Sequence, residues 1–167
     1  CVFHPNRNDL LVSDTNGISR YHPDLSTPRR LEFSPPEVIH PGNGWQILDF
    51  SADARFFAAF NARSNFALVF DHTLTNRVAT LGPHAGAGAM SISPDGRWLT
   101  TASRNDRSVK VWDVTQEKLV LTLPAGLQSR GSFSPDGRWL VVSDEDRFEL
   151  RETGTWKHSL NFQNGSS

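Results

Sequence analysis

Along the whole chain, short runs of apolar residues alternate with turn residues. Runs rich in Val, Ile, Phe, Leu and Thr are broken about every 8–12 positions by Gly, Pro, Asn or Asp, which is typical of β-strands joined by tight turns. Residues 108–113 show the pattern clearly, because Val109 and Val111 share one face while Lys110 and Trp112 share the other. Pro and Gly interrupt the chain too often for a long amphipathic helix. The pattern therefore predicts an all-β protein.

The strand pattern repeats four times. An apolar residue followed by a turn recurs, at separations of 47, 42 and 41 residues, at Phe3, Phe50, Ile92 and Phe133. The last two copies continue with the same heptapeptide, Ser-Pro-Asp-Gly-Arg-Trp-Leu, beginning at Ser93 and Ser134. Four strands in each period of about 40 residues are typical of a β-propeller. We expect one domain over residues 1–167, with four consecutive four-stranded antiparallel blades near residues 1–33, 46–81, 88–123 and 130–162.

The third period resembles a known family. It opens with Gly82-Pro83-His84, continues through Ser93-Pro94-Asp95-Gly96 and closes with Val109-Lys110-Val111-Trp112-Asp113. With its Gly-x-His start and its Trp-Asp end, this segment resembles a WD40 repeat. The resemblance extends over essentially the whole chain but is less marked elsewhere: where Trp-Asp would stand, the first, second and fourth periods have Tyr21-His22, Phe70-Asp71 and Arg151-Glu152.

The number of blades limits how such a propeller closes. Propellers contain about 4–8 blades, and the resemblance implies a ring at the upper end of that range. Four blades then make about half a ring and leave two apolar sheet faces uncovered, which soluble monomers avoid. We consider three arrangements, in decreasing order of preference. The blades belong to a longer chain, two copies pair as four plus four blades, or the chain closes alone.

The resemblance also implies a structural hydrogen-bond network in the third blade. In WD40 repeats it links a His before the first strand, a hydroxyl on the second, an Asp in the next turn and the Trp of the third. Transferred to this sequence, the network consists of His84, either Thr101 or Ser103, Asp106 and Trp112. A buried indole N–H needs an acceptor and a buried carboxylate needs donors. This role accounts for residues that resemble a catalytic triad, and we predict no catalytic residue.

Composition and charge exclude several classes of function. The 17 Lys and Arg residues are balanced by 18 Asp and Glu, with no basic run, which argues against nucleic acid or an anionic membrane as the partner. No apolar stretch approaches the ~20 residues that span a bilayer. Cys1 is the one cysteine, so the sequence has no intramolecular disulfide. Residues 82–90 lack the lysine of a phosphate-binding loop, and residues 143–146 lack EF-hand spacing. We therefore expect no cofactor and no metal.

These observations favour a non-catalytic scaffold that binds a protein or a peptide. The resemblance implies docking surfaces on the rim formed by the inter-blade connections and the turns between second and third strands. Arg and Trp are favoured interface anchors. The predicted partner-binding rim comprises Trp45, His84, Arg104, Arg107, Arg130, Asp144 and Asp146. Trp45 and Trp156 have no counterpart in the other periods, so we expect them to serve something other than the core.

Two alternative functions stay open. The heptapeptide and residues 147–156 resemble bacterial repeats that are fused to Ser/Thr protein kinase domains, which suggests a regulatory propeller of a larger bacterial enzyme. TolB-like repeats also use Ser-Pro-Asp-Gly, which suggests a periplasmic propeller or a propeller enzyme. The Trp-Asp and Gly-x-His marks favour the WD40 interpretation, and with it we expect a cytoplasmic location.

Overall fold

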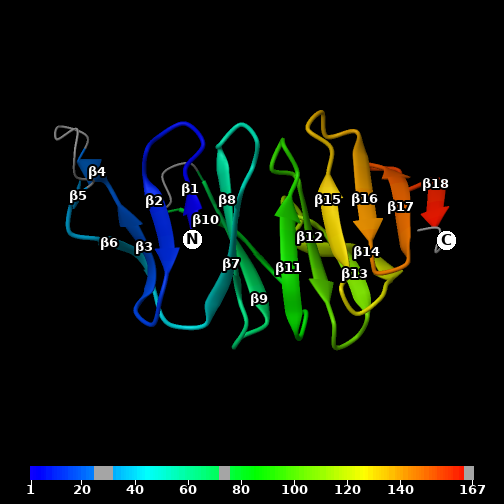
Figure 1. Ribbon diagram of the computed structural model, residues 1–167, viewed down its shortest axis with the longest axis horizontal. Helices are drawn as coiled ribbons and strands as arrows, with labels where there is room; N and C mark the ends of the chain where they lie inside the picture. The colour runs from blue at the N-terminus through cyan, green and yellow to red at the C-terminus, as the bar shows by residue number, and fades with distance from the viewer. Residues whose placement is uncertain (25–31, 72–75, 164–167) are drawn as a thin grey trace.

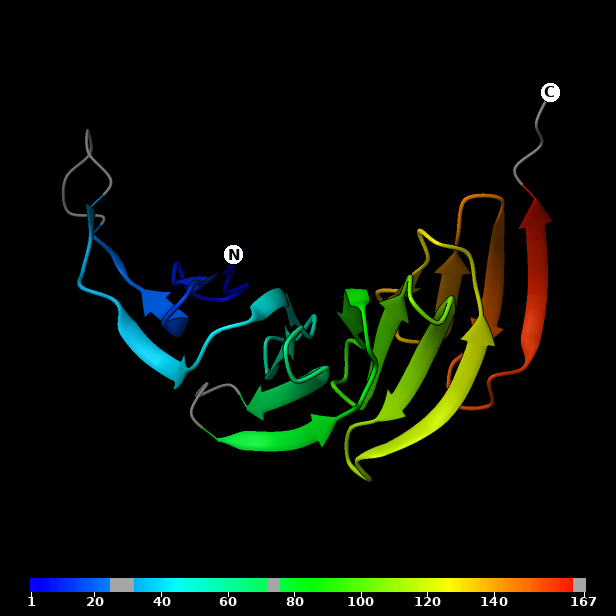
Figure 2. The same cartoon turned by 90° about the horizontal axis from the view of Figure 1, so that it is seen from below.

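Four antiparallel sheets follow one another along the chain. The computed structural model describes residues 1–24, 32–71 and 76–163, and these ranges contain strands and turns but no helix. Four four-stranded sheets stand side by side (Figure 1). Seen from below, they form an open arc with the first and fourth sheets at its ends (Figure 2). The predicted all-β class and the serial four-stranded blades are confirmed. Within the described ranges, no helix meets the length and apolarity needed to cross a bilayer.

Each sheet is a simple meander whose strands pair in chain order. The first sheet contains β1 (Val2–Phe3), β2 (Leu10–Ser13), β3 (Gly17–Tyr21) and β6 (Glu37–Pro41). The second contains β7 (Trp45–Phe50), β8 (Phe56–Asn61), β9 (Phe66–Asp71) and β10 (Arg77–Leu81). The third contains β11 (Ala87–Ile92), β12 (Trp98–Ser103), β13 (Ser108–Asp113) and β14 (Lys118–Pro124). The fourth contains β15 (Arg130–Phe133), β16 (Trp139–Ser143), β17 (Arg147–Glu152) and β18 (His158–Gln163).

The first blade differs from the sequence prediction. The sequence predicts that this blade ends near residue 33, but the strand that pairs with β3 as its fourth strand is β6. Glu32–Phe33 is instead β5, which pairs with β4 (Pro23–Asp24) in a separate two-stranded sheet. Two consecutive prolines at 35 and 36 explain the difference, because they offer no N–H to a sheet and delay the last strand. The first blade therefore extends to residue 41.

The hydrophobic core is divided among the three junctions between neighbouring sheets. Each junction has one cluster, because both faces of a middle sheet carry apolar side chains that pack on the next sheet. Buried members include Leu11, Ile18 and Phe57 at the first junction, Phe60, Val69 and Leu99 at the second, and Val109, Val111 and Leu140 at the third. The sheets are therefore stacked face to face, as in a propeller.

The two ends of the arc have no such cover. Among the described residues, the three most exposed large apolar side chains are Phe3 at 62%, Phe162 at 55% and Val38 at 50%. All three belong to the first or the fourth sheet, and soluble monomers usually bury such surfaces. The chain is therefore a partial propeller with two open ends.

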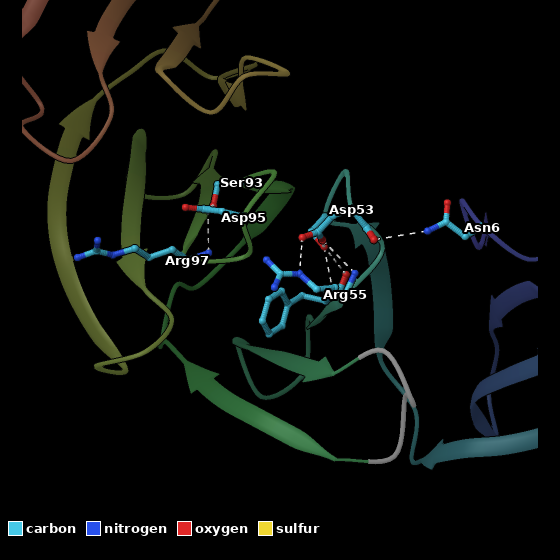
Figure 3. Close-up of polar contacts among 8 residues, drawn as sticks. Asn6, Asp53, Arg55, Ser93, Asp95 and Arg97 are labelled. Atoms are coloured by element: carbon cyan, nitrogen blue, oxygen red, sulfur yellow. Dashed lines mark hydrogen bonds and ion pairs between the residues drawn. The ribbon is translucent and has the colours of Figure 1, made fainter.

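In the second, third and fourth sheets, the turn between the first and second strands has the same structure, and Figure 3 shows the turns of the second and third. In the third sheet, Ser93 Oγ donates to Asp95 Oδ1 at 2.6 Å and accepts the N–H of Trp98 at 2.9 Å, while the same carboxylate accepts the N–H of Arg97 at 3.1 Å. The second and fourth sheets repeat these bonds at equivalent positions. The side-chain bonds close the turn locally, which explains why the Ser-x-Asp pattern recurs in the sequence.

Candidate functional site at the junction of the third and fourth sheets

A hydrogen-bonded chain of side chains lies inside the third sheet. The indole N–H of Trp112 donates to Thr101 Oγ1 at 2.9 Å, and this hydroxyl contacts His84 Nδ1 at 2.6 Å. The carboxylate of Asp106 beside His84 Nε2 can only accept, so Nε2 carries the imidazole proton and the hydroxyl of Thr101 donates to Nδ1. Ser103 takes no part and donates to the carbonyl oxygen of Ala85 at 2.7 Å. Of the two hydroxyls proposed from the sequence, Thr101 is the one in the network.

The other imidazole nitrogen completes the network. His84 Nε2 lies 3.2 Å from both Asp106 Oδ1 and Ser108 Oγ, and Ser108 also donates to Asp106 at 2.8 Å. Burial lowers the pKa of His84, which keeps the imidazole neutral. Burial alone would raise the pKa of Asp106, but hydrogen bonds from Ser108 and His84 lower it overall. The network is closed on itself and joins the loop before β11 to β12, the β12–β13 turn and β13.

Two residues assigned to the partner-binding rim face inward instead. His84 is 1% exposed, and Trp45 is 9% exposed with its ring 5.0 Å from that of His40. The prediction that these two side chains meet a partner is therefore wrong: they occupy the predicted loops but point into the core. Trp156 is also packed, since its ring meets Trp98 edge-on at 5.0 Å. The expectation that Trp45 and Trp156 lie outside the core is wrong as well.

The other five predicted rim residues converge on one junction. Three depressions follow each other between the third and fourth sheets, with volumes of about 560, 80 and 490 Å³. The first and second share Leu127, and the second and third share Gly88, Ala89 and Arg130. We call the three together the seam groove. Its rim end is lined by Arg107, Asp144 and Asp146, its middle by Arg104, Ser129 and Arg130, and its inner end by Asp49, Met90 and Ser132.

At the rim end, an acidic turn holds the loop that connects the two sheets. Asp144 accepts the N–H of Gly126 at 3.0 Å and pairs with Arg147 at 3.1 Å. Glu145 accepts the N–H of Gln128 at 2.8 Å. Burial would raise the pKa of Asp144, but hydrogen bonds from backbone amides and from Arg147 lower it overall. Asp144 therefore acts on the groove by fixing its wall, while Asp146 is exposed.

The middle of the groove contains a residue that the sequence gave no reason to select. Ser129 is 7% exposed, and its hydroxyl has no hydrogen-bond partner among the described residues. It lines the same depression as Arg104 and Arg130, which are both exposed. Nothing in the sequence marks this serine, because the depression forms only when residues from two sheets come together.

At the inner end, a carboxylate joins the second and third sheets. Asp49 accepts the N–H of Ile92 at 3.0 Å across the junction and that of Phe50 at 2.9 Å. Burial raises the pKa of Asp49, although these two backbone bonds oppose the change. A single Asp before an apolar residue carries no functional signal in the sequence, and its role is apparent only from the way strand β7 of the second sheet lies beside strand β11 of the third. In the described ranges, no cluster of three His, Cys, Asp or Glu side chains is arranged to hold a metal ion.

A comparison with protein families identifies the repeat. The family described as "WD domain, G-beta repeat" matches residues 75–113. The chain carries a WD40 repeat. The match includes β10, the outer strand of the second sheet, and β11, β12 and β13 of the third. The WD40 repeat is thus offset by one strand from the sheets and spans the junction between two of them.

Solved structures support the propeller fold. The chain is similar to a chain of Kuenenia stuttgartiensis hydrazine synthase, with a TM-score of 0.67 and 16% identity over 96% of this chain and 47% of that one. It is also similar to a chain titled "eukaryotic initiation factor", with a TM-score of 0.61 and 16% identity over 90% of this chain and 39% of that one. The chain spans less than half the length of either structure. At these identities the likeness shows the fold alone. A search of curated proteins gave no significant match.

Proposed function

We propose that the chain is a non-catalytic platform that binds a partner protein or peptide along the seam groove. WD40 propellers generally mediate protein interactions, and the chain carries such a repeat. The observation that carries the proposal is the convergence of five charged rim residues on one groove. Leu127, which is 49% exposed, adds an apolar contact at the point where the rim end meets the middle. A groove with exposed arginines and an apolar contact suits a peptide.

The chemistry of the candidate residues also favours binding over catalysis. His84, which would be the general base of a His–Thr–Asp set, is 1% exposed and has both ring nitrogens engaged. A catalytic base must reach a substrate proton directly or through one water. At the rim end, the carboxylates of Asp144 and Glu145 accept backbone N–H groups. These groups are committed to structure, so a partner is expected to contact the exposed arginines and Leu127.

A position-specific cross-linking experiment tests this proposal. A photoreactive amino acid is placed at Leu127 in the groove or, as a control, at Leu119 on the outer strand β14. The two leucines are matched in exposure, at 49% and 47%. In native host cells, cross-linking from position 127 is expected to give a discrete protein adduct that position 119 does not give. Equal adducts from both positions, or none from 127, would contradict the groove as the docking site.

A second candidate function is a regulatory propeller within a larger bacterial enzyme. The heptapeptide repeated at Ser93 and Ser134 favours it, because it resembles bacterial repeats that are fused to Ser/Thr protein kinase domains. The genomic reading frame distinguishes the candidates. A catalytic domain encoded in the same frame would support the second, while further propeller blades alone would support a scaffold.

A further inference from the structure

We infer that the middle of the seam groove is a pocket for an oxyanion, a carboxylate or a phosphate group carried by a side chain of the bound peptide. This inference rests on the proposed function and specifies its chemistry. Two guanidinium groups support this inference. Arg104 follows β12 and Arg130 begins β15, so the two arginines come from different sheets but line one depression. Neither has a side-chain hydrogen bond or ion pair within the described ranges. Arginine binds carboxylate and phosphate through pairs of parallel hydrogen bonds.

A buried hydroxyl provides an independent reason. Ser129 directly precedes Arg130, lines the same depression as both arginines and is only 7% exposed. Its Oγ has no partner among the described residues. Buried polar groups in folded proteins are almost always hydrogen-bonded, so an unpaired one calls for an explanation. Rotation about its Cα–Cβ bond would let this closed-off hydroxyl donate to an anion held between Arg104 and Arg130.

Small residues keep the pocket open. Gly88, Ala89 and Ala102 form its other walls, and a Cβ placed on Gly88 would meet no atom within 4 Å. The volume of about 80 Å³ admits a few waters or one small polar group. The pocket therefore suits a single anionic group rather than a large ligand.

The connections of the pocket indicate that the anion is part of a peptide. The pocket shares Leu127 with the depression at the rim end, and it shares Gly88 and Arg130 with the depression at the inner end of the groove. A chain in the seam groove would pass over the pocket and insert one side chain. The carboxylates of Asp144 and Glu145 near the rim accept backbone N–H groups, which leaves the two arginines as the charged groups that face this side chain.

Binding of short peptides to the 167-residue chain tests the inference. The probes are capped pentapeptides Gly-Gly-X-Gly-Gly with X as Glu, phosphoserine or Gln, and inorganic phosphate is a separate arm. Backbone amide NMR signals of residues 104 and 128–130 report binding. We expect the Glu or the phosphoserine peptide to shift these signals to saturation and the Gln peptide to leave them unchanged. Equal shifts with the Gln peptide would overturn the inference. Inorganic phosphate binding as tightly as the phosphoserine peptide would assign the pocket to a free ion and overturn its role in peptide binding.

Three variants locate the site. Arg104→Ala and Arg130→Ala are each expected to weaken the anionic peptide by about tenfold or more. Arg138→Ala is the matched control, since Arg138 is also exposed but lies in the β15–β16 turn on the opposite rim. Equal losses in all three variants would indicate a non-specific charge effect and overturn the inference.

A steric variant gives an independent test. Gly88→Val places a branched side chain on a wall of the pocket, where the Cβ itself meets no atom within 4 Å, and we expect it to abolish peptide binding with an unchanged unfolding midpoint. Peptide binding that survives the added side chain would overturn the inference. If the cross-link from position 127 persists while no anionic peptide binds, the oxyanion pocket is wrong and the docking platform stands. If the cross-link is absent while the anionic peptide binds, the proposed function is wrong and the pocket stands.

Discussion

Gly96 in the third sheet lies directly against the ring of Phe56 in the second. A Cβ added at Gly96 would sit 1.9 Å from Phe56 Cδ2, which is far inside van der Waals contact. Gly96 also has a φ of +73°, in the left-handed region that disfavours residues with a Cβ. The glycine of the repeated turn therefore allows the bend and also lets the neighbouring sheet approach.

The contact with Phe56 predicts that an alanine costs more stability at Gly96 than at Gly137, which holds the equivalent position in the fourth sheet. Gly96→Ala is expected to lower the free energy of unfolding by about 2–4 kcal/mol, because it combines left-handed strain with overpacking. Gly137→Ala, at φ +72° with its nearest neighbour 3.8 Å away at Pro94, is expected to cost only about 1–2 kcal/mol. Urea unfolding of both variants gives the comparison. Equal losses would mean that the contact with Phe56 contributes nothing.

The network in the third sheet predicts unequal effects for two adjacent threonines. Thr101→Val removes the hydroxyl that joins Trp112 to His84 and leaves both groups buried without this partner, at a cost of about 2–4 kcal/mol. Thr100→Val is the control, because Thr100 is equally buried but makes only long bonds of 3.3 and 3.4 Å to carbonyl oxygens. Thermal unfolding should rank Thr101→Val clearly below Thr100→Val. The reverse order would contradict a structural role for the network.

The buried carboxylate of Asp49 predicts a pH dependence of unusual sign. Burial raises its pKa in the folded state above the ordinary value of 3.8. The folded protein therefore binds more protons than the unfolded chain between these two values, and stability is lost as the pH rises through them. Relative to Asp49→Asn, the wild type should become less stable as the pH increases from about 3.8 to above the folded pKa. Urea unfolding of both proteins from about pH 3.5 to 6.5 measures this difference. A difference that is constant with pH would contradict it.

The acidic turn predicts different roles for two rim carboxylates. Asp144→Ala frees the N–H of Gly126 and the side chain of Arg147, so we expect a loss of about 2 kcal/mol and faster hydrogen exchange at Gly126. Asp146→Ala changes an exposed position and should alter stability by less than about 0.5 kcal/mol. Hydrogen exchange monitored by NMR distinguishes the two. Similar exchange at Gly126 in both variants would show that Asp144 does not hold the loop.

The sequence predicts the sheets better than the direction of side chains. Strict alternation in residues 108–113 and the identical turns at Ser93 and Ser134 specify strands and hairpins locally, and the structure has them there. The first sheet was placed less accurately, because β4 and β5 form a separate hairpin between β3 and β6. Sequence order alone therefore misleads here, because the strand that pairs with β3 is β6 and not the next strand in the chain, β4.

The candidate site shows a similar limit. Topology places Trp45 and His84 near the predicted rim, but whether their side chains point outward depends on His40 and Thr101, which contact them. Ser129 and Gly88 could not be selected in advance. Their pocket exists only where residues about 40 apart in the chain meet across two sheets.

Four sheets share three apolar junctions, so the sheets differ in how many of their faces are packed against a neighbour. The second and third sheets are held on both faces, while the first and fourth are held on one. In a linear array of this kind, the free energy of opening a unit depends on how many neighbours it must leave. In the isolated 167-residue chain, local unfolding is therefore expected to start in the first and fourth sheets, and the WD40 repeat between them is expected to unfold last.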